Sequence, residues 1–192
     1  MIPLADVDGV RLVALARAAV VSYVRRTPLP SVTDVSDGLV DPRDVFVTVE
    51  APPGTLRGCL GSMGGDESIA AEVVRLAGEA ATSDTRFPPL AFSDLEAFTV
   101  KVSVLGPRIP LVASSPDDLC ARLRPGTDGV VLELPPPGSR ALFLPEVWAK
   151  VENDPGVFLG ALSEKQGAPA SAWRDRFSEA RVSIFQTWVF GA

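Results

Sequence analysis

The sequence predicts an α+β fold in which largely antiparallel sheets pack against helices. Short runs of β-branched and other apolar residues predict strands at 45–49, 99–105, 130–134, 141–144 and 181–190. These runs do not alternate regularly with helices, and the third and fourth form a hairpin, which argues against a doubly wound parallel sheet. The chain has 192 residues, of which 46% are hydrophobic and 22% charged. With no evident linker, we expect one domain, residues 1–192, with a sizeable core.

The first part of the chain predicts a helix followed by two strands. Val7 to Arg26 places valine and alanine side chains at helical spacing, and Pro28 ends the helix. The strand at 45–49 is followed by residues 56–60, which can pair with it as a short strand. A glycine-rich loop is expected next, because Gly58–Gly65 contains four glycines, which adopt positive φ readily.

Three more helices are predicted from their capping residues. Each begins at an Asp or Ser whose side chain can accept a hydrogen bond from the first turn, and two of them continue with proline. The predicted helices run from Asp66 to about Ser83, from Ser115 to about Gly126, and from Asp154 to Gly167.

Composition excludes several classes of function. The chain contains no histidine, which excludes Ser-His-Asp and Cys-His catalysis and histidine-ligated metal sites. Two cysteines cannot build a four-thiolate metal site, and no motif identifies a cofactor. A net charge of −6 argues against a nucleic-acid binder. Without a membrane span or a signal peptide, we expect a cytoplasmic protein in which Cys59 and Cys120 are not disulfide-bonded.

The segment Thr55–Gly65 carries the clearest candidate chemistry. Cys59 is the softest nucleophile in it, and Arg57 would favour the thiolate if the guanidinium approached. Backbone N–H groups at Gly58 and Gly61 would be accessible to a ligand. The structural alternative is that Cys59 is a small buried residue required by close packing.

A second polar block follows the predicted helix that ends near Ser83. Asp84 could serve as a base or ligand contact, and Arg86 could anchor an anionic group through its planar guanidinium. The structural alternative is an ordinary ion pair or a helix cap. We expect Arg57, Cys59, Asp84 and Arg86 to converge on one surface.

These motifs together resemble the AMMECR domain family. Leu56–Gly61 is similar to its L-R-G-C-[IL]-G signature, and residues 80–89 resemble its A-x-x-D-x-R-F-x-P block. Phe143–Val147 resembles its F-L-P-x-V motif, and the likeness covers about residues 45–190. Family members often carry G-x-H-G where this chain has Gly126–Gly129, so Asp128 replaces a histidine and is a candidate ligand or proton-transfer residue.

The resemblance implies a fold with a larger and a smaller lobe, and an activity that is not established. It also implies an association with Memo-like and radical-SAM proteins in a modification pathway. We therefore expect either a small-molecule or modification enzyme with a cleft around Arg57–Gly61, or a non-catalytic protein-interaction module. Substrate, cofactor and oligomeric state do not follow from the sequence.

Overall fold

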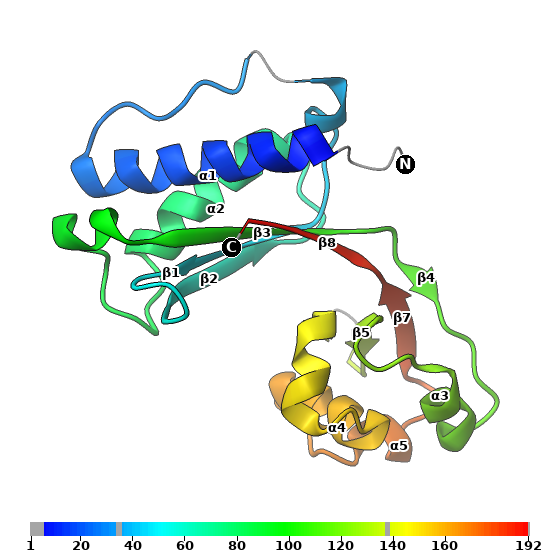
Figure 1. Cartoon of the computed structure of the whole chain (residues 1–192). Coiled ribbons are helices and arrows are strands. Elements are labelled where there is room, and N and C mark those ends of the chain that lie inside the picture. Colours follow the sequence, from blue (N-terminus) through cyan, green and yellow to red (C-terminus); the bar gives the residue numbers. More distant parts are fainter. Residues whose placement is uncertain (1–5, 34–35, 137–138, 192) are drawn as a thin grey trace. The chain divides into compact units, whose positions relative to one another are not determined.

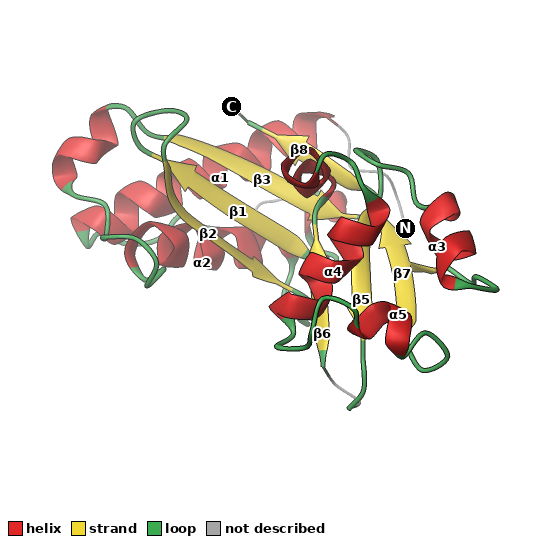
Figure 2. Ribbon diagram, turned by 90° about the horizontal axis from the view of Figure 1, so that it is seen from below, coloured by secondary structure: helices red, strands yellow, loops and turns green. Residues whose placement is uncertain are grey.

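The computed structural model describes residues 6–33, 36–136 and 139–191. The chain divides into two compact units, and each is described by itself. The first unit comprises Met1–Leu105 and Trp188–Ala192, and the second comprises Gly106–Thr187. Figures 1 and 2 show helices and sheet strands in both units.

The first unit is a four-stranded sheet with two long helices on one face (Figure 1). The strand order is β2-β1-β3-β8, and β1 pairs antiparallel with both β2 and β3. Its elements are α1 (Asp6–Arg25), η1 (Asp37–Leu39), β1 (Val45–Glu50), β2 (Leu56–Ser62), α2 (Ile69–Thr82), η2 (Phe92–Glu96), β3 (Thr99–Leu105) and β8 (Thr187–Phe190).

Alternation along β1 explains why one face of this sheet is covered. Val45, Val47 and Val49 are fully buried under the helices, whereas Phe46 and Thr48 point to the opposite face and are half-buried. A strand with period-two burial presents one apolar and one more polar face. We call the face opposite the helices the open face of the first sheet.

The second unit contains a smaller antiparallel sheet of order β4-β7-β5-β6 (Figure 2). Its core includes Trp148 stacked on Phe158, with ring centroids 3.8 Å apart. Its elements are β4 (Ile109–Pro110), α3 (Pro116–Arg122), β5 (Gly129–Glu133), β6 (Arg140–Phe143), η3 (Pro145–Val151), α4 (Pro155–Lys165), α5 (Ala172–Asp175) and β7 (Arg181–Phe185).

The α+β class, the antiparallel pairing and most predicted elements are confirmed. The N-caps Ser115 and Asp154 are confirmed as well, since their side chains accept from the backbone N–H groups of Asp118 and Val157. The prediction of Asp66 as an N-cap was wrong, because Ser68 caps α2 by accepting from Ala71 N–H. The loop expected at Pro135–Gly138, between the two strands of the predicted hairpin, includes residues 137–138, which lie outside the described part of the chain.

Two further predictions were wrong. The expected single strand at 181–190 is divided into β7 and β8, which belong to different sheets. The expected glycine loop is largely strand, since β2 continues to Ser62. Of the four glycines in this segment, only Gly64 has a positive φ, at +71°.

Packing rather than conformational freedom requires the two glycines inside β2. A Cβ at Gly58 would collide with the backbone carbonyl of Ala80 in α2. A Cβ at Gly61 would collide with the ring of Phe46 on the neighbouring strand. Gly58 therefore allows β2 to pack directly on the α2 backbone, which cannot move aside as a flexible side chain could.

Gly58→Ala should therefore destabilise the protein. We expect the free energy of unfolding in urea to fall by about 1–3 kcal/mol, the usual cost of overpacking a core. Gly65→Ala is the matched control, because its Cβ would meet only the ends of the Glu72 and Ser62 side chains. Equal stabilities of the two variants would contradict the packing explanation.

Candidate functional site

The candidate site is built on β2, an edge strand of the first sheet. Cys59 lies opposite Thr48 of β1, so its side chain belongs to the open face. Its backbone N–H and C=O groups point away from β1, toward the edge of the sheet. An unpaired edge of this kind is usually protected by other parts of the chain.

Asp84 and Arg86 provide that protection at Cys59. One carboxylate oxygen of Asp84 accepts a hydrogen bond from Cys59 N–H at 3.0 Å. The Arg86 Nη2 donates to the Cys59 carbonyl oxygen at 2.7 Å. Asp84 and Arg86 thus bind the N–H and C=O groups of Cys59, which a neighbouring strand would otherwise bind. We call this arrangement the edge clamp.

The two clamp side chains are also bound to each other. Arg86 Nε donates to Asp84 Oδ1 at 2.9 Å, and Nη2 donates to Oδ2 at 2.7 Å. The Asp84 side chain is only 3% exposed, whereas that of Arg86 is 60% exposed. Arg86 Nη1 has no hydrogen-bond partner within the described parts of the chain. Arg86 can therefore bind an external anion without releasing Asp84.

The clamp fixes the protonation state of Asp84. Hydrogen bonds from Arg86, and further ones from the backbone N–H groups of Cys59 and Arg86, hold the pKa of Asp84 well below its usual range. Asp84 in turn raises the pKa of Arg86 by hydrogen bonding, and the charge of a Cys59 thiolate acts in the same direction. A permanently ionised carboxylate is a poor proton acceptor. Asp84 is therefore a positioning residue here and an unfavourable general base.

Arg57 connects segments that are distant in sequence. Its guanidinium donates to the carbonyl oxygens of Ala51, Pro88 and Pro89 at 3.4 Å, and Nη2 reaches the Asp94 carboxylate at 3.3 Å. Its side chain is 18% exposed, and Nε is buried with no hydrogen-bond partner among the residues that the structure describes. Arg57 thus holds the β1–β2 turn against the 88–94 segment, and this geometry makes it a poorer anion anchor than Arg86.

The Cys59 thiol takes no part in the edge clamp, which binds only the backbone of this residue. It is half-buried, unlike the aliphatic core around β1, and it accepts a hydrogen bond from Thr48 Oγ1 at 3.3 Å. Thr48 was not among the residues predicted from the sequence. The available signal was that Thr48 is a polar residue in the middle of a predicted strand, on the face opposite the buried valines.

Asp128 belongs to the second unit and is fully buried. Its carboxylate accepts from Arg124 N at 2.9 Å and from Arg124 Nη2 at 2.6 Å. Its backbone carbonyl accepts from Trp148 Nε1 at 2.7 Å. The carboxylate therefore stabilises the turn before β5, and this geometry favours a structural role over ligand binding.

The other expectations concern cysteines, metals and membranes. Both cysteines are free thiols, and burial raises the pKa of Cys120. Within residues 6–33, 36–136 and 139–191, no three Cys, Asp or Glu side chains gather as a metal site would require. Across those same residues, none of the helices has the length and apolarity to span a bilayer.

The depressed pKa of Asp84 predicts an acid-sensitive contribution to stability. Asp84→Asn should lower the free energy of unfolding at pH 7 by about 1–3 kcal/mol, because it removes hydrogen bonds to a charged group. This contribution is complete above the unfolded pKa of about 4 and is lost as the pH falls toward the lower folded value.

Urea unfolding of both proteins between pH 2.5 and 7 measures the effect. The difference between wild type and Asp84→Asn should shrink steadily below about pH 4. The exposed Asp66, changed to Asn, is the control and should alter stability by less than about 0.5 kcal/mol. A difference that is independent of pH would show that Asp84 is not held ionised by the clamp.

Comparisons with known proteins agree with this architecture. The AMMECR1 family profile matches residues 13–190. A protein from Methanothermobacter thermautotrophicus is 36% identical over 191 residues, covering 98% of this chain and 96% of its own. Protein Ta0236 of Thermoplasma acidophilum is 33% identical over 199 residues, covering 98% and 91%.

A solved structure shares the fold as well. The crystal structure of the uncharacterised protein PH0010 from Pyrococcus horikoshii superimposes with a TM-score of 0.86 at 28% sequence identity. The match covers 98% of this chain and 93% of that one. The profile match, the sequence relatives and the shared fold together place this chain in the AMMECR1 family.

Proposed function

We propose that Cys59 is the functional group of this protein, acting on a small molecule or in a protein-modification reaction. In this proposal the thiol is the nucleophile or the contact with the ligand, and Arg86 binds an anionic group on the same ligand. Asp84 keeps Arg86 in place, and the Gly58–Gly61 segment positions the thiol. In this proposal the protein is an enzyme that uses the Cys59 thiol.

One observation carries this proposal: the half-buried Cys59 is bound through its backbone carbonyl by Arg86, whose Nη1 has no partner among the described residues. The Arg86 Nη2 is 2.7 Å from the Cys59 carbonyl oxygen, so the guanidinium is bound to the residue that carries the thiol. A positive charge near a cysteine favours the thiolate, which is the reactive form. A neutral surface around Cys59 would offer no comparable reason for function.

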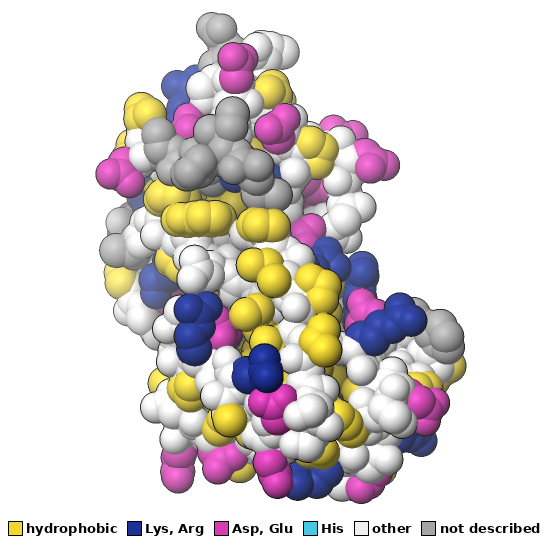
Figure 3. All heavy atoms as spheres, turned by 90° about the vertical axis from the view of Figure 1, so that its right-hand side faces the viewer, with side chains coloured by type: hydrophobic (Ala, Val, Ile, Leu, Met, Phe, Trp, Pro, Cys, Tyr) yellow, Lys and Arg dark blue, Asp and Glu magenta, His cyan; other side chains and the backbone are white. Residues whose placement is uncertain are grey.

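Two other charged groups extend the polar character of the open face. Lys101 of β3 lies in register with Thr48, and its Nζ donates to Glu50 at 2.8 Å. The charges of Lys101 and Glu50 partly neutralise each other, so Arg86 remains the main candidate to bind an anion. On the face shown in Figure 3, positive and negative side chains are interspersed, so this face carries no continuous basic stripe of the kind that binds a nucleic-acid backbone.

The proposed pathway is the one implied by the family resemblance, in which Memo-like and radical-SAM proteins take part. The second candidate function is a non-catalytic docking module for such a protein. The exposed ring of Phe92, which is 66% accessible on η2, favours this alternative, because exposed aromatic residues often anchor interfaces.

Two variants distinguish these functions. Affinity for the purified Memo-like protein of the same organism can be measured by calorimetry. A docking module should lose affinity in Phe92→Ala and keep it in Cys59→Ser. The proposed thiol function requires instead that Cys59→Ser abolishes turnover of the pathway while the protein remains folded.

The charge beside Cys59 can be tested with two alkylating agents. Iodoacetate is anionic and iodoacetamide is neutral. The alkylation rate with iodoacetate divided by the rate with iodoacetamide therefore reports the electrostatic environment of a thiol. We expect this ratio to be higher at Cys59 than at Cys120, and to fall by about threefold or more in Arg86→Gln, as expected for a lost charge near the surface. Arg86→Lys is the matched control and should retain part of the preference.

Mass spectrometry of each cysteine-containing peptide over time gives both rates in one sample. Raising the salt concentration should reduce the preference at Cys59, because the attraction is electrostatic. A ratio at Cys59 that does not respond to Arg86→Gln would remove the physical basis of the proposal.

A further inference from the structure

A pocket of about 400 Å³ lies entirely within the second unit. It forms beside β7 at the point where β4 ends: β4 pairs with Ser183 and Ile184, and Leu111 N–H donates to the Val182 carbonyl oxygen at 2.8 Å. Its volume is within the range of small-molecule sites, about 300–1,000 Å³. The pocket is lined by Pro110, Leu111, Val112, Ala113, Leu119, Glu133, Phe177, Ser178, Ala180, Arg181, Val182 and Ser183.

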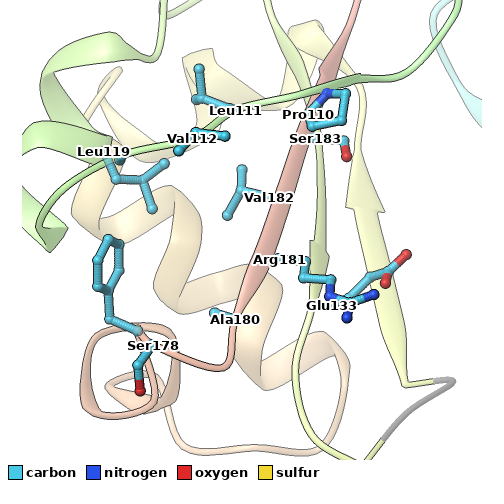
Figure 4. Close-up of a pocket in the computed structure, with 12 residues that line it drawn as sticks. Pro110, Leu111, Val112, Leu119, Glu133, Ser178, Ala180, Arg181, Val182 and Ser183 are labelled. Atoms are coloured by element: carbon cyan, nitrogen blue, oxygen red, sulfur yellow. The ribbon is translucent and has the colours of Figure 1, made fainter.

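The interior of the pocket is apolar. Leu119 and Val182 belong to the buried core of this unit, and Leu111 and Phe177 pack against that core. Figure 4 shows Leu111, Leu119 and Val182 on one side of β7. Val112 is 80% exposed beside them, so apolar surface continues from the pocket to the outside. A ligand would therefore present an apolar body here.

Charged side chains lie on the other side of β7. Figure 4 shows Arg181 and Glu133 extending toward each other there. Glu133 lies in register with Arg181 on one side and with Arg140 of β6 on the other. The three residues thus form a row across three strands, with two positive charges and one negative charge. Within the part of the chain that the structure describes, none of the three has a hydrogen-bond or ion-pair partner for its charged group.

We propose that this pocket binds a small organic carboxylate. Its apolar body occupies the space between Leu111, Leu119 and Val182, and its carboxylate reaches past the edge of β7 to Arg181, which also lines the pocket. The excess positive charge of the row favours an anion, because Glu133 can balance only one of the two arginines. Arginine also suits a carboxylate geometrically, since it can donate two parallel hydrogen bonds.

This site is independent of the one around Cys59. All residues that line it lie between Gly106 and Thr187, whereas Cys59 and the edge clamp belong to the first unit. The proposal does not require the thiol to react, and it would hold for a docking module as well as for an enzyme.

The probe is 4-phenylbutyrate, which combines an apolar ring with a carboxylate. 4-Phenylbutanamide has nearly the same shape without the charge. Titration of the full-length, isotope-labelled protein should shift the amide signals of residues 111–113 and 177–183 with the acid. 4-Phenylbutanamide should bind at least about tenfold more weakly than 4-phenylbutyrate, which is the effect of losing one charge-assisted hydrogen bond.

Four variants test the roles of individual residues. Arg181→Gln should weaken 4-phenylbutyrate binding about tenfold or more, whereas Lys150→Gln, which removes an exposed charge outside the lining, should not. Glu133→Gln should leave the affinity unchanged or raise it, because the acid repels the ligand. Ala180→Leu should reduce binding by filling the pocket.

Several results would overturn the proposal. One is the absence of localised shifts at millimolar 4-phenylbutyrate, and another is equal affinity for the amide. Weaker binding of 4-phenylbutyrate in Glu133→Gln would show that Glu133 does not repel the carboxylate, against the charge argument. Equal effects of Arg181→Gln and Lys150→Gln would show that only overall charge matters.

Discussion

The first unit depends on how its edge strand β2 is held. On its inner side the strand packs on α2 so closely that residue 58 has no room for a side chain. On its outer side the edge clamp binds both backbone groups of Cys59, at 3.0 Å and 2.7 Å. The strand is thus fixed from two directions at neighbouring residues. This double constraint explains why glycine, aspartate and arginine occur together in the signature motifs.

The constraint also separates structural from chemical roles among the motif residues. Gly58, Gly61 and Arg57 are accounted for by packing and by hydrogen bonds to backbone carbonyls. Asp84 is buried and ionised, and its oxygens are used within the clamp. What remains for a ligand is the half-buried thiol of Cys59 and the exposed part of Arg86. Most residues of the signature motifs therefore have structural roles, and they surround the thiol of Cys59 and the guanidinium of Arg86.

Much of the fold could be predicted because local patterns and capping agree with it. The alternating strand at 45–49 and the caps at Ser115 and Asp154 are examples in which a few neighbouring residues determine the outcome. The failures required distant contacts. Ser68 and Asp66 are both acceptable caps in isolation, and the division of residues 181–190 between two sheets depends on partners far away in the chain.

The candidate site was predictable to the same degree. Of the four residues expected to converge, Cys59, Asp84 and Arg86 come together, whereas Arg57 binds the 88–94 segment. That Asp84 and Arg86 would bind the backbone of Cys59, however, depends on β2 being an edge strand, which no local pattern reveals. The same holds for Thr48, which becomes a thiol partner only through the register of β1 and β2.

The most direct test of the edge clamp is hydrogen exchange at two amides of β2. Cys59 and Gly61 both direct their N–H groups to the outer edge, but only that of Cys59 is bound by Asp84. NMR-detected exchange at neutral pH should show strong protection of the Cys59 amide and little protection of the Gly61 amide. In Asp84→Asn, the Cys59 amide should exchange markedly faster. Equal exchange of the two amides in the wild-type protein would contradict the account.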